Sequence, residues 1–100
     1  MISKFDSFFM GMALREAEKA SSDGEVPTGC VIVEPSPAAG GVDGSFDPDP
    51  STARILARTH NQSEMLRDAT AHAEMLALTS AAAAKGAWRL SGTRLYVTKE

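Results

Sequence analysis

The chain has 100 residues, of which 43% are hydrophobic and 23% are charged, and its formal net charge is -3 at pH 7. These values are typical of one small soluble domain and exclude a largely disordered chain. The acidic balance excludes an electrostatic grip on nucleic acid by the whole chain, because phosphate binding needs clustered Lys and Arg.

Cysteine content and hydropathy indicate the cellular compartment in which the protein is expected. Cys30 is the single cysteine and cannot form an internal disulfide, so nothing indicates an oxidising compartment. No apolar run reaches the roughly 20 residues that span a bilayer. Lys4 and Asp6 make the N-terminal stretch a poor secretory signal. We therefore expect a cytoplasmic protein with no membrane partner.

The first predicted element is a helix. Apolar residues recur at a 3.6-residue spacing from Phe5 to Ala20, which is typical of an amphipathic helix. Ser3 can cap it, with Asp6 three residues later as in a capping box. Gly24 is expected to end it, since Gly adopts the left-handed conformation that often follows a helix. We interpret this helix as a scaffold element that covers a sheet.

Two strands with a long connection come next. Residues 30–33 are apolar and β-branched, which predicts a strand buried on both faces and therefore helices on each side of the sheet. Residues 34–52 hold four of the five prolines and predict a surface loop. We interpret it as a loop insertion at about 34–53 in a strand-turn-strand unit, because lengthening a surface loop costs little free energy. Residues 54–59 predict the second strand, and Asn61 lies just beyond its end.

A second helix and a third strand complete the pattern. We expect Thr70 to cap the helix, which then runs to Ala84 or Lys85 and is closed by Gly86. The helix is apolar on nearly every side, which predicts that it is buried. Residues 93–98 largely alternate apolar and polar side chains, as a strand does.

The order helix, strand, strand, helix, strand predicts one layered α/β domain. The first two strands should pair as a hairpin, and the third should join the sheet across the second helix. No internal repeat is present in the sequence.

The residues best suited to chemistry are the triplet His72-Ala73-Glu74 at the start of the second helix. Side chains there lean back past the helix end, so both can approach a site beyond it. His72 can supply a neutral nitrogen ligand to zinc, and Glu74 can carry protons to and from a bound water. Taken alone, the triplet leaves open a half-buried core histidine and a glutamate that complements the helix dipole.

Four pieces of sequence then change the interpretation. Residues 25–29 precede the first strand, Asn61 follows the second, residues 70–78 open the second helix and residues 95–100 form the third strand. In this order and at these separations they resemble the tRNA adenosine deaminase family of the cytidine-deaminase-like superfamily. The resemblance covers nearly the whole chain except the 34–52 segment. It implies an α/β/α cytidine-deaminase-like sheet flanked by helices, with the C-terminal part of that fold absent.

The resemblance also implies roles for single residues. His72 would bind zinc, and Glu74 would be the catalytic proton carrier. The substrate-binding residues would be Asn61, the backbone N–H of Ala73, and Val26 and Pro27 in the pocket wall. The implied reaction is hydrolytic: water replaces the exocyclic amine, ammonia leaves, and adenosine in a tRNA anticodon loop becomes inosine. The family is typically a homodimer.

Other residues keep simpler interpretations. Asn61 also fits an ordinary turn residue after a strand. Cys30 lies inside a predicted buried strand, where a thiol behaves as a small hydrophobe, so we do not count it as a metal ligand. Trp88 fits the core or an interface. His60 fits a strand-end histidine, and its place beside Asn61 leaves a minor pocket role open.

The family pattern continues into Pro-Cys-x-x-Cys, whose two cysteines complete the zinc site, and these 100 residues contain neither. A catalytic zinc takes about three protein ligands. We therefore expect residues 1–100 to form a single incomplete deaminase domain, part of a longer enzyme and inactive alone. The alternatives are a deaminase of a free base or nucleoside (guanine or cytosine), a non-catalytic relative that kept the fold, and a plain structural or interaction protein.

Overall fold

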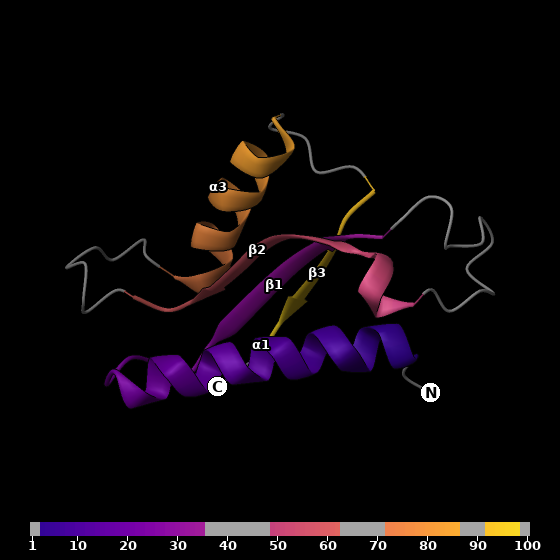
Figure 1. The fold of residues 1–100 in the computed structure, drawn as a ribbon. Helices are drawn as coiled ribbons and strands as arrows, with labels where there is room; N and C mark the ends of the chain where they lie inside the picture. The colour runs from indigo at the N-terminus through magenta and orange to yellow at the C-terminus, as the bar shows by residue number, and fades with distance from the viewer. Residues whose placement is uncertain (1–2, 36–48, 63–71, 87–91, 99–100) are drawn as a thin grey trace.

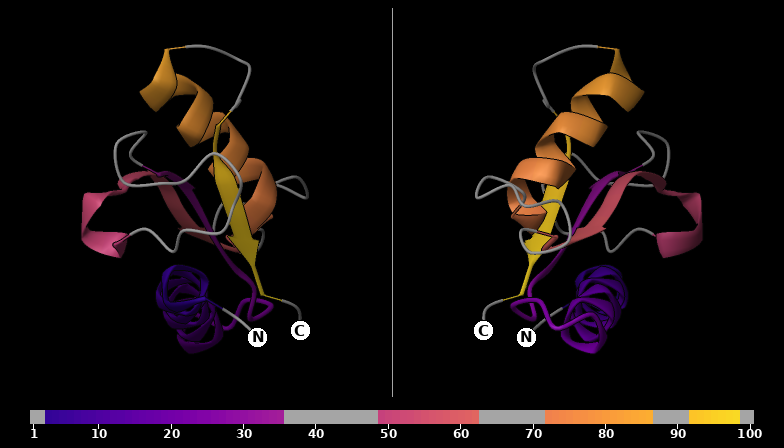
Figure 2. Two further views of the ribbon diagram at one scale, coloured as in Figure 1. Left: turned by 90° about the vertical axis from the view of Figure 1, so that its right-hand side faces the viewer. Right: turned by 90° about the vertical axis from the view of Figure 1, so that its left-hand side faces the viewer.

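The computed structural model describes residues 3–35, 49–62, 72–86 and 92–98. Its elements are α1 (Lys4–Ser22), β1 (Gly29–Glu34), the 3-10 helix η1 (Pro50–Thr52), β2 (Arg54–His60), α3 (Ala73–Lys85) and β3 (Arg94–Val97). The strands form one sheet, with α1 on one face and α3 on the other (Figures 1 and 2). The expected α/β/α layering is confirmed. None of the described helices has the length and apolar character that crossing a membrane would require.

The sheet has the strand order β2-β1-β3, and β1 is antiparallel to both neighbours. This confirms the predicted hairpin and the return of the third strand across a helix. The β1–β2 register contains a bulge: Ile32 pairs with Ala57 and Val33 with Ile55, so Leu56 is the extra residue. Leu56 and Ala57 are consequently both buried on the α3 side of the sheet.

Because β1 is buried on both faces, it separates two apolar clusters. The cluster under α1 comprises Phe5, Phe9, Met12, Ala13, Val31, Val33 and Tyr96. The cluster under α3 comprises Cys30, Ile32, Leu56, Ala57, Ala73, Ala77 and Ala81. Alternate residues of β1 thus pack against opposite helices, because successive side chains of a strand point to opposite faces of the sheet.

The start of α1 follows the sequence prediction. Ser3 Oγ accepts the Asp6 backbone N–H at 3.0 Å, which satisfies one of the free donors at the helix start. The helix ends at Ser22, and Gly24 takes a φ of 75°. Gly29 lets β1 approach this helix closely, because a Cβ there would lie 2.1 Å from the Ala13 carbonyl oxygen.

Two predictions for α3 are wrong. The helix begins at Ala73 with His72 as its N-cap, two residues after the predicted start, and Thr70 lies outside the described residues. The helix is also not buried on all sides, since Met75 is 53% and Leu78 41% exposed. Only its alanine face meets the sheet, because one helix on one sheet buries one face. The prediction that Gly86 closes the helix is confirmed, with a φ of 71°.

The connection between β1 and β2 differs in part from the expected loop. Residues 50–52 form the 3-10 helix, capped by Asp49, whose carboxylate accepts the Ser51 N–H at 2.9 Å. Residues 36–48 and Trp88 lie outside the described residues. The third strand is two residues shorter than the predicted 93–98.

Candidate active site

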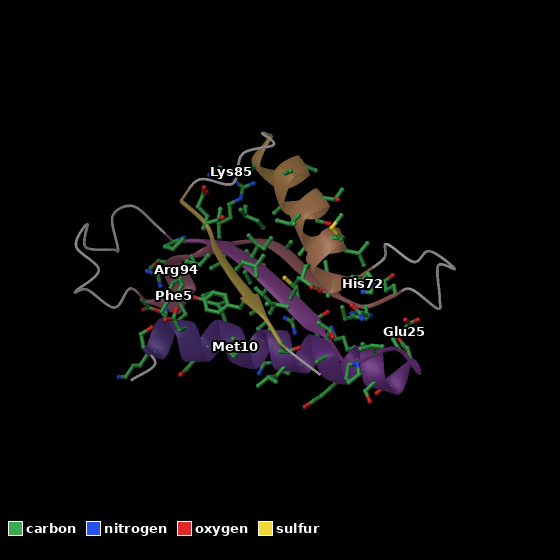
Figure 3. All side chains as sticks on the ribbon, turned by 180° about the vertical axis from the view of Figure 1, so that it is seen from behind. Phe5, Met10, Glu25, His72, Lys85 and Arg94 are labelled. Carbon is green, nitrogen blue, oxygen red and sulfur yellow. The ribbon has the colours of Figure 1, made fainter. Side chains whose placement is uncertain are left out.

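A cleft of about 390 Å³ lies at the N-terminal end of α3. The described residues that line it are Val26, Thr28, Asn61, His72, Glu74, Val97 and Thr98. In Figure 3, His72 and Glu25 lie at one end of the molecule, while Phe5 and Arg94 lie together at the other. Four chain segments meet here: the approach to β1, the ends of β2 and β3, and the start of α3.

The sheet brings three of these segments together. Since β1 is antiparallel to both neighbours, its start lies beside the ends of β2 and β3. The Asn61 N–H donates to the Thr28 carbonyl at 3.1 Å. The Gly29 N–H donates to Thr98 Oγ1 at 2.9 Å, and the Thr98 N–H donates to the Gly29 carbonyl at 3.0 Å. Thr28, Asn61 and Thr98 therefore form a fixed, buried rim at this edge.

The start of α3 supplies the two ionisable side chains. His72 has the extended backbone of an N-cap, with φ -77° and ψ 150°, and Glu74 lies in the first helical turn. Both residues are exposed at the cleft. Within the described part of the chain, neither side chain makes a hydrogen bond or an ion pair. The site thus presents an imidazole and a carboxylate that a ligand can reach, at the positive end of a helix.

Asn61 lies just after β2, as expected, and is 4% exposed. Its Oδ1 accepts the Ala73 backbone N–H at 2.7 Å. Thr59, two residues earlier, donates its hydroxyl to the Ala73 carbonyl at 2.6 Å. The structure therefore places the Ala73 N–H on Asn61, and its contact with a base stays a prediction.

The alternate residues of β2 face the other way. Arg58 Nε donates to Glu16 Oε2 at 2.6 Å, and His60 Nδ1 lies 3.1 Å from Glu16 Oε1. Burial would raise the pKa of Glu16, but hydrogen bonds with Lys19, His60 and Arg58 outweigh it and lower that pKa from 4.5 to about 2. His60 thus belongs to a hydrogen-bonded cluster around Glu16 of α1 and is not among the described residues that line the cleft.

Cys30 is fully buried in the apolar cluster under α3. Burial, and secondarily the negative charge of Glu74, raises the pKa of its thiol to about 12. Metal binding needs the thiolate, which this environment disfavours. The geometry agrees with its interpretation as a core residue.

Of the two remaining candidates, Val26 and Pro27, only the first is among the described residues that line the cleft. Val26 lines the cleft and is 44% exposed. Pro27 is exposed and is not among the described lining residues, so its part in a pocket wall stays a prediction. Sequence reasoning missed Thr28, Thr59 and Thr98. Thr59 could have been found from strand period alone, because residues two apart share a face with Asn61.

A family model matches nearly the whole chain. The model described as "Cytidine and deoxycytidylate deaminase zinc-binding region" matches residues 3–100. The chain belongs to this family of zinc-binding deaminase domains, and zinc is the family's cofactor.

Two relatives with similar sequences are tRNA adenosine deaminases. The tRNA-specific adenosine deaminase of Bacillus subtilis is 41% identical over 95 residues, which are 95% of this chain and 48% of that protein. The chloroplastic tRNA(adenine(34)) deaminase of Arabidopsis thaliana is 43% identical over 95 residues, which are 95% of this chain and 6% of that protein. The chain thus spans about half the length of the bacterial relative.

Solved structures share the fold. A structure from a study of A-to-I editing by tRNA:A34 deaminases matches with a TM-score of 0.68 and 38% identity, over 92% of this chain and 58% of that one. The guanine deaminase of Bacillus subtilis matches with a TM-score of 0.71 and 29% identity, over 94% of this chain and 50% of that one.

The donor set fits zinc only in part. An exposed imidazole at the cleft suits a zinc ligand, and the carboxylate beside it suits proton transfer. However, the described residues contain no group of three His, Cys, Asp or Glu side chains that could hold a metal ion. A catalytic zinc at His72 therefore requires further ligands from outside the described residues.

Proposed function

We propose that the protein containing this chain catalyses the zinc-dependent, hydrolytic deamination of adenosine to inosine in a tRNA anticodon loop. The observation that carries the proposal is the convergence of His72, Glu74 and Asn61 on one cleft at the start of α3. The relatives named as tRNA adenosine deaminases support the substrate, since they match 95% of the chain at 41% and 43% identity.

The reaction replaces an amine by an oxygen. Water adds at the ring carbon that bears the amine, the carbon–nitrogen bond breaks, and ammonia leaves. Zinc, when bound, supplies the Lewis acidity that makes water a nucleophile at neutral pH. His72 is the ligand that the described residues offer, and Glu74 takes a proton from water and delivers it to the departing amine.

The rim of the cleft supports a role in binding the base. Asn61, Thr28 and Thr98 bring polar side chains to a buried edge, and Val26 and Val97 add apolar surface. Planar bases are held by this combination of apolar walls and a few fixed polar groups. The net charge of -3 implies that any contact with tRNA phosphates comes from a local basic surface.

The test is an assay of the complete native protein, supplied with zinc. An anticodon stem-loop with adenosine at the wobble position is compared with free guanine and free cytosine, and released ammonia and inosine are measured. The control is the Glu74→Gln protein at equal zinc content. Inosine formation that Glu74→Gln abolishes supports the proposal, whereas no deamination of the stem-loop by fully zinc-loaded protein overturns it.

Deamination of free guanine is the second candidate function. It is favoured by the structural match to a guanine deaminase over 94% of the chain, at a TM-score of 0.71. In the same assay, ammonia release from guanine with an unreacted stem-loop would select this candidate.

The assembly, location and extra segment are further parts of the proposal. The family resemblance implies a homodimer, and the single cysteine and the poor secretory signal imply a cytoplasmic location. Sedimentation of the complete protein tests the first, and cell fractionation the second. We also keep the interpretation of residues 34–53 as a loop insertion in a single domain. Its shortening to a turn should leave deamination unchanged.

A further inference from the structure

The backbone at Ala73 is held from both sides by one strand. Thr59 Oγ1 donates to the Ala73 carbonyl at 2.6 Å, and Asn61 Oδ1 accepts the Ala73 N–H at 2.7 Å. The N–H belongs to the peptide that joins Ala73 to His72, and the carbonyl belongs to the peptide that joins it to Glu74. Both peptide groups next to the candidate active-site residues are therefore fixed by the end of β2 and the residue that follows it.

Strand geometry explains why these two side chains act together. Thr59 and Asn61 are two residues apart at the end of β2, so they project to the same face of the sheet. The residues between and before them, His60 and Arg58, project to the opposite face and bond to Glu16 of α1. The end of β2 is thus fastened to both helices at once.

The hydrogen bond to Asn61 has no substitute within α3. The first N–H groups of a helix have no intrahelical acceptor, and the His72 side chain makes no capping hydrogen bond. Asn61 is 4% exposed and Ala73 is fully buried, so water replaces this acceptor poorly. Ala73 also packs in the apolar cluster under α3, which leaves its backbone little freedom.

We propose that Thr59 and Asn61 are positioning residues that clamp the two peptide groups of Ala73 and so fix the directions of His72 and Glu74 at the cleft. As an account of catalysis, the inference rests on the proposed function. The clamp itself is a property of the described residues and can be tested without any deamination assay.

The chain allows the clamp to be separated from other roles. Asn61→Asp keeps an oxygen for the Ala73 N–H but loses the amide donor that a substrate contact would use, whereas Asn61→Ala loses both. Thr59→Ser keeps the hydroxyl, and Thr59→Val removes it at nearly constant volume. Thr79→Val is the matched control, because the exposed Thr79 hydroxyl bonds only to the Met75 carbonyl of its own helix.

The first measurement is amide hydrogen exchange at Ala73 in the complete native protein. Asn61→Ala should speed exchange by roughly tenfold or more, the factor set by a lost buried hydrogen bond. Asn61→Asp and Thr79→Val should exchange at about the parent rate. Parent-like protection of Ala73 in Asn61→Ala would overturn the clamp.

The second measurement is zinc affinity, from competition with a chelator, together with kcat and KM. Thr59→Val should weaken zinc binding by about tenfold, as loss of an outer partner of a ligand does, and lower kcat more than KM. Thr59→Ser should restore both. Equal values for Thr59→Val and the parent would overturn the positioning role. A parent that binds zinc but deaminates nothing would overturn the proposed function and leave the clamp to be judged by exchange and zinc affinity.

Discussion

The carboxylate of Glu16 on α1 accepts a hydrogen bond from Arg58 on β2 at 2.6 Å, and the Glu16 side chain is only 4% exposed. Lys19 and His60 approach the same carboxylate at 2.8 and 3.1 Å. A buried carboxylate is costly unless it is paired, and here three partners compensate the lost hydration. This cluster anchors the scaffold helix to the strand that ends at the cleft.

The pH dependence of stability should carry the signature of Glu16. Its pKa is about 2 in the folded protein against an ordinary 4.5. Because the folded-state pKa is the lower one, the stabilisation is complete above about pH 4.5 and is lost as the pH falls toward 2. A shift of this size corresponds to about 3 kcal/mol at neutral pH. Denaturant unfolding from pH 7 to pH 2 measures it.

Glu16→Gln should lower stability at pH 7 and flatten the acid limb of that profile. Glu18→Gln, an exposed change on the same helix, is the control and should leave the profile unchanged. An acid limb equally steep in Glu16→Gln and the parent would refute the assignment.

Gly29→Ala should destabilise the protein by roughly 3 kcal/mol or more, at the upper end of overpacking costs. The new Cβ would lie 2.1 Å from the Ala13 carbonyl oxygen and 2.7 Å from the Ala17 nitrogen, and neither backbone atom can move without the helix. Gly11→Ala is the matched control. Its Cβ would meet only the flexible Arg15 side chain at 3.7 Å, so it should stabilise α1 by about 0.5–1 kcal/mol. Thermal unfolding of both variants decides the sign of each.

Tyr96→Phe should lower stability by about 2 kcal/mol, because the phenol donates to the carboxylate Oδ1 of Asp6 at 2.5 Å and a hydrogen bond to a charged group is a strong one. Burial and the Asp6 carboxylate raise the pKa of Tyr96 to about 12. The difference between the ultraviolet titrations of the parent and Tyr96→Phe should therefore show the phenol of Tyr96, the single tyrosine of these 100 residues, ionising above its ordinary pKa of 10. Ionisation near pH 10 would contradict this contact.

His72→Ala and Glu74→Gln should impair the enzyme in different ways, the first through zinc content and the second through kcat. Loss of the imidazole should lower the zinc content of the complete protein, since a nitrogen ligand is removed. Glu74→Gln should keep its zinc and lower kcat by roughly 10²–10⁴-fold, the range for a lost proton carrier. Both residues are exposed, so circular dichroism should show intact folds. Zinc loss in Glu74→Gln, or full activity in either variant, would contradict these roles.

Local sequence signals predicted the elements well. Hydrophobic spacing located α1, the β-branched run located β1, and Ser3, Gly24 and Gly86 marked helix ends as their backbone and side-chain properties require. These features depend on neighbouring residues alone. The strand pairing also followed, because few topologies suit this order of elements.

Features set by tertiary contact were missed. The start of α3 was misplaced because its first N–H is satisfied by Asn61 from another element, where propensity favoured Thr70. The bulge at Leu56 has no local signature. The burial of Glu16 depends on partners 42 and 44 residues away. His72 and Glu74 were candidates from their chemistry at a predicted helix start, and the family resemblance added Asn61 as a binding residue. Thr59 was missed, although it lies two residues before Asn61 and shares its face of the sheet.

The antiparallel pairing of β1 with β3 has a consequence for synthesis. Gly29 and Thr98 bond across 69 residues, so one edge of β1 has no partner strand until nearly all of the described chain is made. At about 5–20 residues per second, translation of that interval takes roughly 3 to 14 s. For these seconds every new chain presents an open, apolar strand edge, and pairing with a second nascent chain competes with correct folding.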